Sequence, residues 1–86
     1  MPEISRFFGI VIKMYFNDHG PPHFHAEYGE EEALFSIREL EVIEGGLPPR
    51  ATALVLEWAQ ANRSALMKNW DSIRGGATPR RIKPLV

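Results

Sequence analysis

The sequence predicts an α+β fold: a three- to four-stranded antiparallel β-meander with one face packed against a long amphipathic helix. Two observations predict it. Short segments rich in β-branched and aromatic residues, separated by glycine and proline clusters, fill the first half of the chain. In the second half, apolar residues recur at three- and four-residue spacing, which is the period of a helix. We therefore expect one domain over residues 1–86, with the sheet in 1–46, the helical part in 47–76 and an extended tail in 77–86.

Four segments of the first half are the expected strands. The first covers residues 7–16, and a turn containing Pro21 and Pro22 follows it because proline has no N–H to give to a sheet. The second, residues 23–28, alternates cleanly between two kinds of side chain. Residues 33–37 form the third expected strand and residues 39–43 the fourth.

The helical part is expected to run from residue 50 to residue 74, ending at Gly75 and Gly76. A helix of this length is longer than a small sheet needs. Either it breaks near Asn62, whose side chain would cap a second helix, or its far half reaches beyond the sheet. The tail holds three apolar residues that we expect to pack back on the domain: Ile82, Leu85 and Val86.

Charge is distributed unevenly along the chain. Residues 1–46 carry three basic against nine acidic residues, a balance of −6, whereas residues 47–86 carry seven against two, a balance of +5. This polarity is either a solvated acidic sheet edge beside a basic tail or a dipole that docks on a second copy or on a charged partner. The total of −1 disfavours nucleic acid as the partner. The chain has no cysteine and no long apolar run, so we expect a cytoplasmic protein without a membrane span.

All three histidines lie within seven positions of one another, and they are the candidate chemical site. His23 and His25 are two residues apart on an expected strand, so both imidazoles point to the same side. With His19 across the turn they would supply three nitrogen ligands, and Asp18 and Glu27 would add carboxylate oxygens. Such a set suits a divalent transition metal such as zinc.

Two other interpretations of the histidine stretch remain open. In one, His23, His25 and Glu27 are catalytic residues of metal-free acid–base chemistry, such as RNA cleavage. In the other, the histidines are structural and lie on the solvated face of an edge strand. The two tryptophans, Trp58 and Trp70, are expected in the core or at an interface.

One further pattern spans nearly the whole chain. Its parts are residues 1–5, 9–14, 18–29 with Pro-Pro-His-Phe-His-Ala at 21–26, 44–48 and 82–85, together with Trp58, Leu66 and Trp70. This combination resembles the bacterial family called domain of unknown function 4160. The resemblance implies a small cytoplasmic bacterial protein whose gene often neighbours one for domain of unknown function 2442, a two-gene arrangement of toxin–antitoxin type. It implies no catalytic residues, because no activity is established for the family.

These observations lead to three functional hypotheses. The first is an interaction protein, either a homo-oligomer or one half of a two-gene pair. The second is a metal-binding protein or metal-dependent enzyme that uses the three histidines. The third is a metal-free ribonuclease-type toxin.

Overall fold

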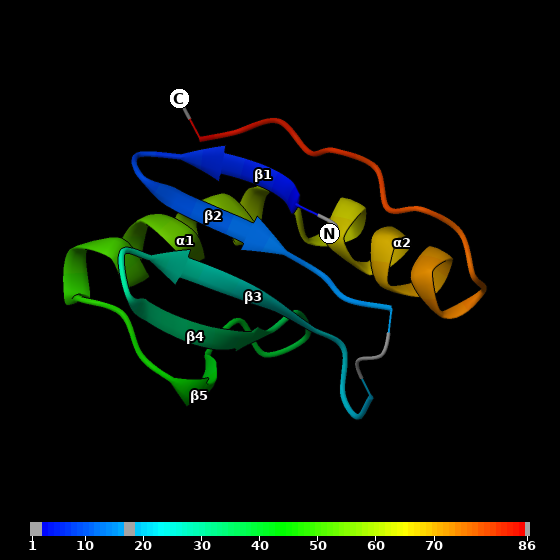
Figure 1. The fold of residues 1–86 in the computed structure, drawn as a ribbon, viewed down its shortest axis with the longest axis horizontal. Helices are drawn as coiled ribbons and strands as arrows, with labels where there is room; N and C mark the ends of the chain where they lie inside the picture. Colours follow the sequence, from blue (N-terminus) through cyan, green and yellow to red (C-terminus); the bar gives the residue numbers. More distant parts are fainter. Residues whose placement is uncertain (1–2, 17–18, 86) are drawn as a thin grey trace.

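The computed structural model of the chain describes residues 3–16 and 19–85. Its elements follow in the order β1 (Glu3–Phe7), β2 (Ile10–Lys13), β3 (His23–Tyr28), β4 (Glu31–Ser36), β5 (Val42–Gly45), α1 (Pro49–Ala61) and α2 (Arg63–Arg74). Each strand pairs antiparallel with the next, giving a sheet in the order β1-β2-β3-β4-β5 (Figure 1). The α+β class and the antiparallel meander are therefore confirmed.

The predicted number of three or four strands is wrong. β1 lies almost wholly ahead of the first predicted strand at 7–16, which is itself shortened to β2. The chain reverses at Phe8 and Gly9, whose φ angles are 49° and 79°, and Phe7 then pairs with Ile10. A two-residue hairpin turn needs positive φ at its central residues, which glycine adopts without strain. The pattern of apolar residues continues across this turn, so the reversal is invisible in periodicity alone.

The later strands lie close to their predicted positions. β3 has the predicted bounds, and β4 overlaps the predicted third strand. β5 begins at Val42, three residues later than predicted. A turn occupies the intervening residues, where the Leu40 N–H donates to the carbonyl of Ser36 over 2.9 Å and Leu40 has a φ of 53°.

The predicted long helix is two helices, α1 and α2, and the break at Asn62 is one of the two expected outcomes. The predicted side-chain cap of the second helix is wrong. The Asn62 side chain turns back and donates to the Trp58 carbonyl over 2.8 Å, so it satisfies the end of α1 instead. Neither helix is both long and apolar enough to cross a bilayer.

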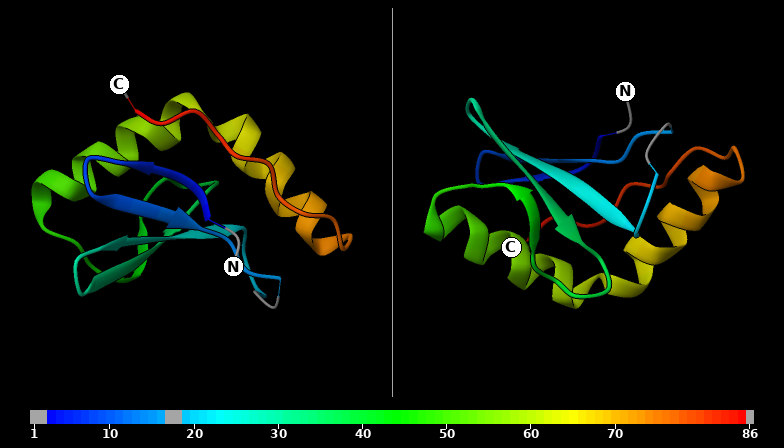
Figure 2. Two further views of the ribbon diagram at one scale, coloured as in Figure 1. Left: turned by 45° about the horizontal axis from the view of Figure 1, so that its top comes forward. Right: turned by 90° about the horizontal axis from the view of Figure 1, so that it is seen from below.

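Both helices lie on one face of the sheet (Figure 2). The core between the two layers holds Phe24, Phe35, Val55, Trp58 and Leu66, each at most 1% exposed. The Trp58 ring lies 5.2 Å from that of Phe7 and 5.9 Å from that of Phe24. Burial of each large apolar side chain stabilises the fold by about 1.5–3 kcal/mol, so this layer holds helix and sheet together.

The tail returns past α2 to the β1 edge of the sheet (Figure 1). The Ile82 N–H donates to the Ile4 carbonyl over 2.8 Å, and Ile82 is buried as predicted. Leu85 packs partly against the core, while Val86 lies outside the described residues. Because the tail covers β1, β5 is the open edge of the sheet.

Candidate functional site

Four rings from three parts of the fold lie in one row, which we call the ring row: Tyr15, His25, His23 and Trp70. The ring of Tyr15, which follows β2, meets that of His25 edge-on at 4.6 Å between centroids. The rings of His25 and His23 are 5.5 Å apart, and His23 lies 5.2 Å from Trp70 of α2. The Arg74 guanidinium lies over the Trp70 ring, 5.9 Å from its centroid, within the range of a cation–π contact.

His23 is held rigidly where β3 begins. The carbonyl of Pro22 accepts the Ile37 N–H over 3.0 Å, which fixes the backbone just before the histidine. The carbonyl of Pro21 lies 2.9 Å from His23 Nδ1 and accepts its proton. His23 is only 6% exposed and β3 lies between β2 and β4, so the expectation that the histidines lie on the solvated face of an edge strand is wrong. The reason is tertiary: α2 brings Trp70 against this end of the strand.

His25 is held from the neighbouring strand. Its Nδ1 lies 3.1 Å from Oε2 of Glu32 on β4, and its side chain is 13% exposed. A carboxylate accepts, so Nδ1 is the protonated nitrogen, and in the neutral form of each histidine Nε2 carries the lone pair. An imidazole fixed through Nδ1 by an oxygen is the arrangement found in metal ligands and in general bases.

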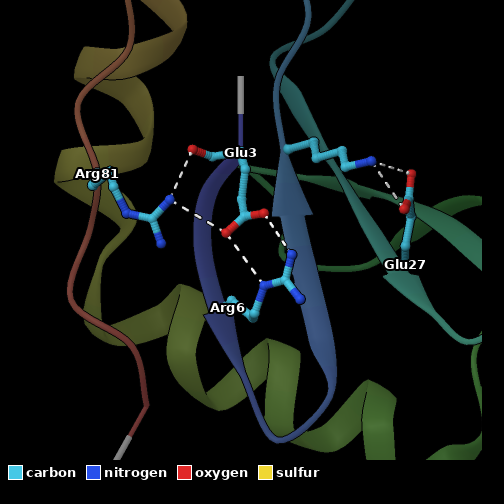
Figure 3. A network of polar contacts seen from close by, with 5 residues as sticks. Glu3, Arg6, Glu27 and Arg81 are labelled. Atoms are coloured by element: carbon cyan, nitrogen blue, oxygen red, sulfur yellow. Dashed lines mark hydrogen bonds and ion pairs between the residues drawn. The ribbon is translucent and has the colours of Figure 1, made fainter. Parts of the chain in front are cut away.

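The third predicted catalytic residue, Glu27, is paired with a lysine. Its carboxylate lies 3.0 Å from Nζ of Lys13 on the neighbouring strand (Figure 3). The hydrogen bond to Glu27 raises the pKa of Lys13 above its ordinary value of 10.5. Glu27 therefore balances a half-buried lysine beside the ring row.

A second group of charged side chains lies at β1, an edge strand of the sheet. Glu3 accepts from Arg6 at 2.9 Å and from Arg81 of the tail at 3.3 Å (Figure 3). The hydrogen bond from Arg6 is the main reason that the pKa of Glu3 is lowered, and the bond from Arg81 adds to it. This group ties the tail to that edge strand.

The structure brings two of the three histidines together. His19 is exposed, and it belongs neither to the ring row nor to any hydrogen bond or ion pair of the described residues. Within residues 3–16 and 19–85, no three His, Asp or Glu side chains are grouped so as to hold a metal ion. The predicted ligand Asp18 lies outside the described residues.

A family model for the domain of unknown function DUF4160 matches residues 9–71. The chain belongs to the DUF4160 family. No curated protein and no solved structure matches it. The match confirms the resemblance seen in the sequence, and it spans all four rings of the ring row, from Tyr15 to Trp70. The tail lies beyond the matched DUF4160 residues.

Both tryptophans of this DUF4160 domain lie in its interior. Trp58 is 1% exposed and its Nε1 donates to the Lys83 carbonyl over 2.8 Å. Trp70 is 4% exposed and contacts His23. Both rings therefore pack within this chain. Trp58 lies in the core and bonds to the tail, and Trp70 lies in the ring row.

Sequence reasoning missed Tyr15 and Glu32. A signal for Glu32 was available, because the β3–β4 hairpin pairs Tyr28 with Glu31 across a two-residue turn. That register places Glu32 diagonally next to His25 on the same face. No comparable signal existed for the contact of His23 with Trp70, which depends on the direction of α2.

Proposed function

We propose that the protein is an interaction protein, one member of a small bacterial two-protein pair of toxin–antitoxin type. The observation that carries the proposal is the sheet face opposite the helices, which α2 reaches only at its end, where Trp70 contacts His23 (Figure 2). Lys13, His25 and Glu27 lie on this face, and all three are half-buried. Lys13 forms an ion pair with Glu27, and His25 contacts the carboxylate of Glu32. Ordered polar groups on an open sheet suit recognition of a partner surface.

The uneven charge of the chain also supports a protein partner. Residues 1–46 carry −6 and residues 47–86 carry +5, of which the tail supplies three charges through Arg80, Arg81 and Lys83. Opposed charges steer association and select the orientation of a partner. The two-gene arrangement implied by the family resemblance supplies the candidate, the neighbouring gene product.

The test is size-exclusion chromatography with light scattering, on this protein alone and mixed with the neighbouring gene product. A complex of defined mass is expected. Val11→Arg, on the open face, is expected to abolish it, whereas Gln60→Arg, exposed on α1, is the matched control and is expected to leave it intact. Separate elution of the two proteins would overturn the proposal.

The histidine pair supports a second candidate, metal binding. Its favouring observation is that an oxygen lies within 3.1 Å of Nδ1 in both His23 and His25, which sets the lone pairs on Nε2. Elemental analysis after purification is expected to find a divalent metal that is missing from the His23→Ala/His25→Ala variant. His19→Ala is the control. Unchanged metal content in this variant would mean that His23 and His25 bind the metal without His19, and a loss would mean that all three histidines are ligands. Equal metal content in wild type and double variant excludes this candidate.

The same pair serves the third candidate, metal-free RNA cleavage by a general acid and a general base. This candidate predicts cleavage that persists with a chelator and disappears in the double variant. Cleavage by the double variant would assign the activity to a contaminant.

A further inference from the structure

A pocket of about 160 Å³ opens at the end of the sheet where the first turn of α1 meets two hairpin tips. We call it the end pocket. Figure 1 shows the β1–β2 tip, the β3–β4 tip and the start of α1 at this one end. Ile10, Ala51 and Leu54 line it, with Phe8, Tyr28 and Arg50. A lined apolar cavity of about 150 Å³ accepts one benzene-sized group, so the end pocket accommodates a single aromatic or branched aliphatic side chain.

Two aromatic side chains of the end pocket are exposed. Phe8 is 61% exposed and Tyr28 is 40% exposed. Phe8 also holds a φ of 49°, a left-handed conformation that a bulky residue adopts only at a cost. Among the described residues, Phe8 takes part in no ring–ring contact. An occupant of the pocket would cover its exposed ring.

The end pocket is positive on its α1 side, whereas the β3–β4 tip on its other side carries Glu30 and Glu31. Arg50 lies in the first turn of α1, and that turn has no acidic residue. The residue before the helix is Pro48, which makes no side-chain cap, so the partial positive charge of the helix start adds to that of Arg50. The pocket therefore suits an apolar side chain next to a carboxylate.

The open sheet edge of the same chain offers that chemistry. β5 exposes Val42 by 37% and Ile43 by 47%, and Glu44 follows directly. No ion pair of the described residues involves Glu44. β5 also pairs with β4 alone, so no other strand of the described residues pairs along its outer side.

We propose that β5 of a second copy docks at the end pocket, with Ile43 entering the cavity and Glu44 facing Arg50. Both surfaces belong to every copy, so two copies related by a two-fold axis fill each other's pockets. A chain of 86 residues buries a modest share of its surface alone, which favours such pairing. This self-association is separate from the partner protein proposed above, and either can fail while the other holds.

Sedimentation equilibrium over a wide range of protein concentration tests the proposal. Wild type is expected to form a dimer. Arg50→Glu and Glu44→Arg are each expected to weaken the dimer by about tenfold or more, as for removal of a close interfacial charge pair. The combined variant Arg50→Glu/Glu44→Arg is expected to recover the dimer, because the pair is restored with its signs exchanged.

Two controls carry the same charge changes elsewhere: Lys68→Glu on α2 and Glu57→Arg on α1, both at exposed positions. They are expected to dimerise as wild type does. Ile43→Asp, which tests the cavity rather than the charge pair, is expected to give a monomer. A wild type that stays monomeric throughout, or single variants that dimerise as strongly as wild type, would overturn the proposal.

Discussion

The imidazole of His23 lies 5.2 Å from the indole of Trp70, so the first histidine of the strand motif packs against the second helix. His25, two residues later, reaches Tyr15 and Glu32 instead. The two histidines thus link β3 to helix α2, to the segment after β2 and to β4. Whatever chemistry the pair performs, its first member also has a structural role.

His23→Ala is expected to lower the free energy of unfolding by about 1–3 kcal/mol, because it leaves a gap against Trp70 and removes the bond to Pro21. Urea unfolding followed by tryptophan fluorescence measures the change. His19→Ala is the control, since His19 is exposed, and should stay within about 0.5 kcal/mol of wild type. Equal losses in both variants would contradict the packing role of His23.

Asn69→Ala is expected to release the tail. The buried Asn69 side chain donates to the Arg80 carbonyl over 2.8 Å and accepts the Arg80 N–H over 2.9 Å. Loss of both bonds should cost about 1–3 kcal/mol, and the Ile82 amide should exchange with solvent hydrogen faster. The neighbouring variant Lys68→Ala, at an exposed position of the same helix, should leave that exchange rate unchanged.

Acid should weaken the fold partly through Glu3. Its pKa lies below the ordinary value of 4.5 because Arg6 and Arg81 bond to the carboxylate. The folded state then favours ionised Glu3, so this stabilisation is present above pH 4.5 and is lost as the pH falls through the lowered pKa. Thermal unfolding of Glu3→Gln across this range should depend less on pH than that of wild type.

The matched control for that measurement is Glu57→Gln. Glu57 is exposed on α1 and forms no ion pair with the described residues, so its removal should leave the acid dependence unchanged. A pH dependence of Glu3→Gln identical to that of wild type would show that the Arg6 and Arg81 contacts add no stability.

Phe8→Asn is expected to stabilise the monomer by about 1 kcal/mol, because asparagine tolerates the left-handed conformation that Phe8 holds. Urea unfolding at low protein concentration measures it. Phe16→Asn makes the same exchange at another exposed aromatic, one without positive φ, and should bring no gain. Destabilisation by Phe8→Asn would mean that the Phe8 ring supports the folded monomer.

Much of the fold could be predicted from local pattern. The alternation of residues 23–28 located β3, the three-and-four spacing located the helices, and Asn62 marked their junction. The hairpin at Phe8 could not be found in this way, because apolar residues continue through it and only the backbone angles reveal the reversal.

The candidate site was predictable only within its own strand. Alternation placed His23 and His25 on one side, and their rings lie 5.5 Å apart. Burial of His23 depends on the direction that α2 takes after Asn62, which is a property of packing between distant segments. Periodicity carries no information about such contacts.

The tail contact also bears on the order of folding. Every strand pairs with its neighbour in sequence, so each hairpin closes a short loop. The contact of Arg81 with Glu3 instead joins residues 78 positions apart. Closing the longer loop costs more chain entropy, and local pairs form faster. We therefore expect the meander to assemble early and the docking of Ile82 on Ile4 to be a late step, which a stopped-flow experiment on a tail-labelled chain would resolve as the last phase.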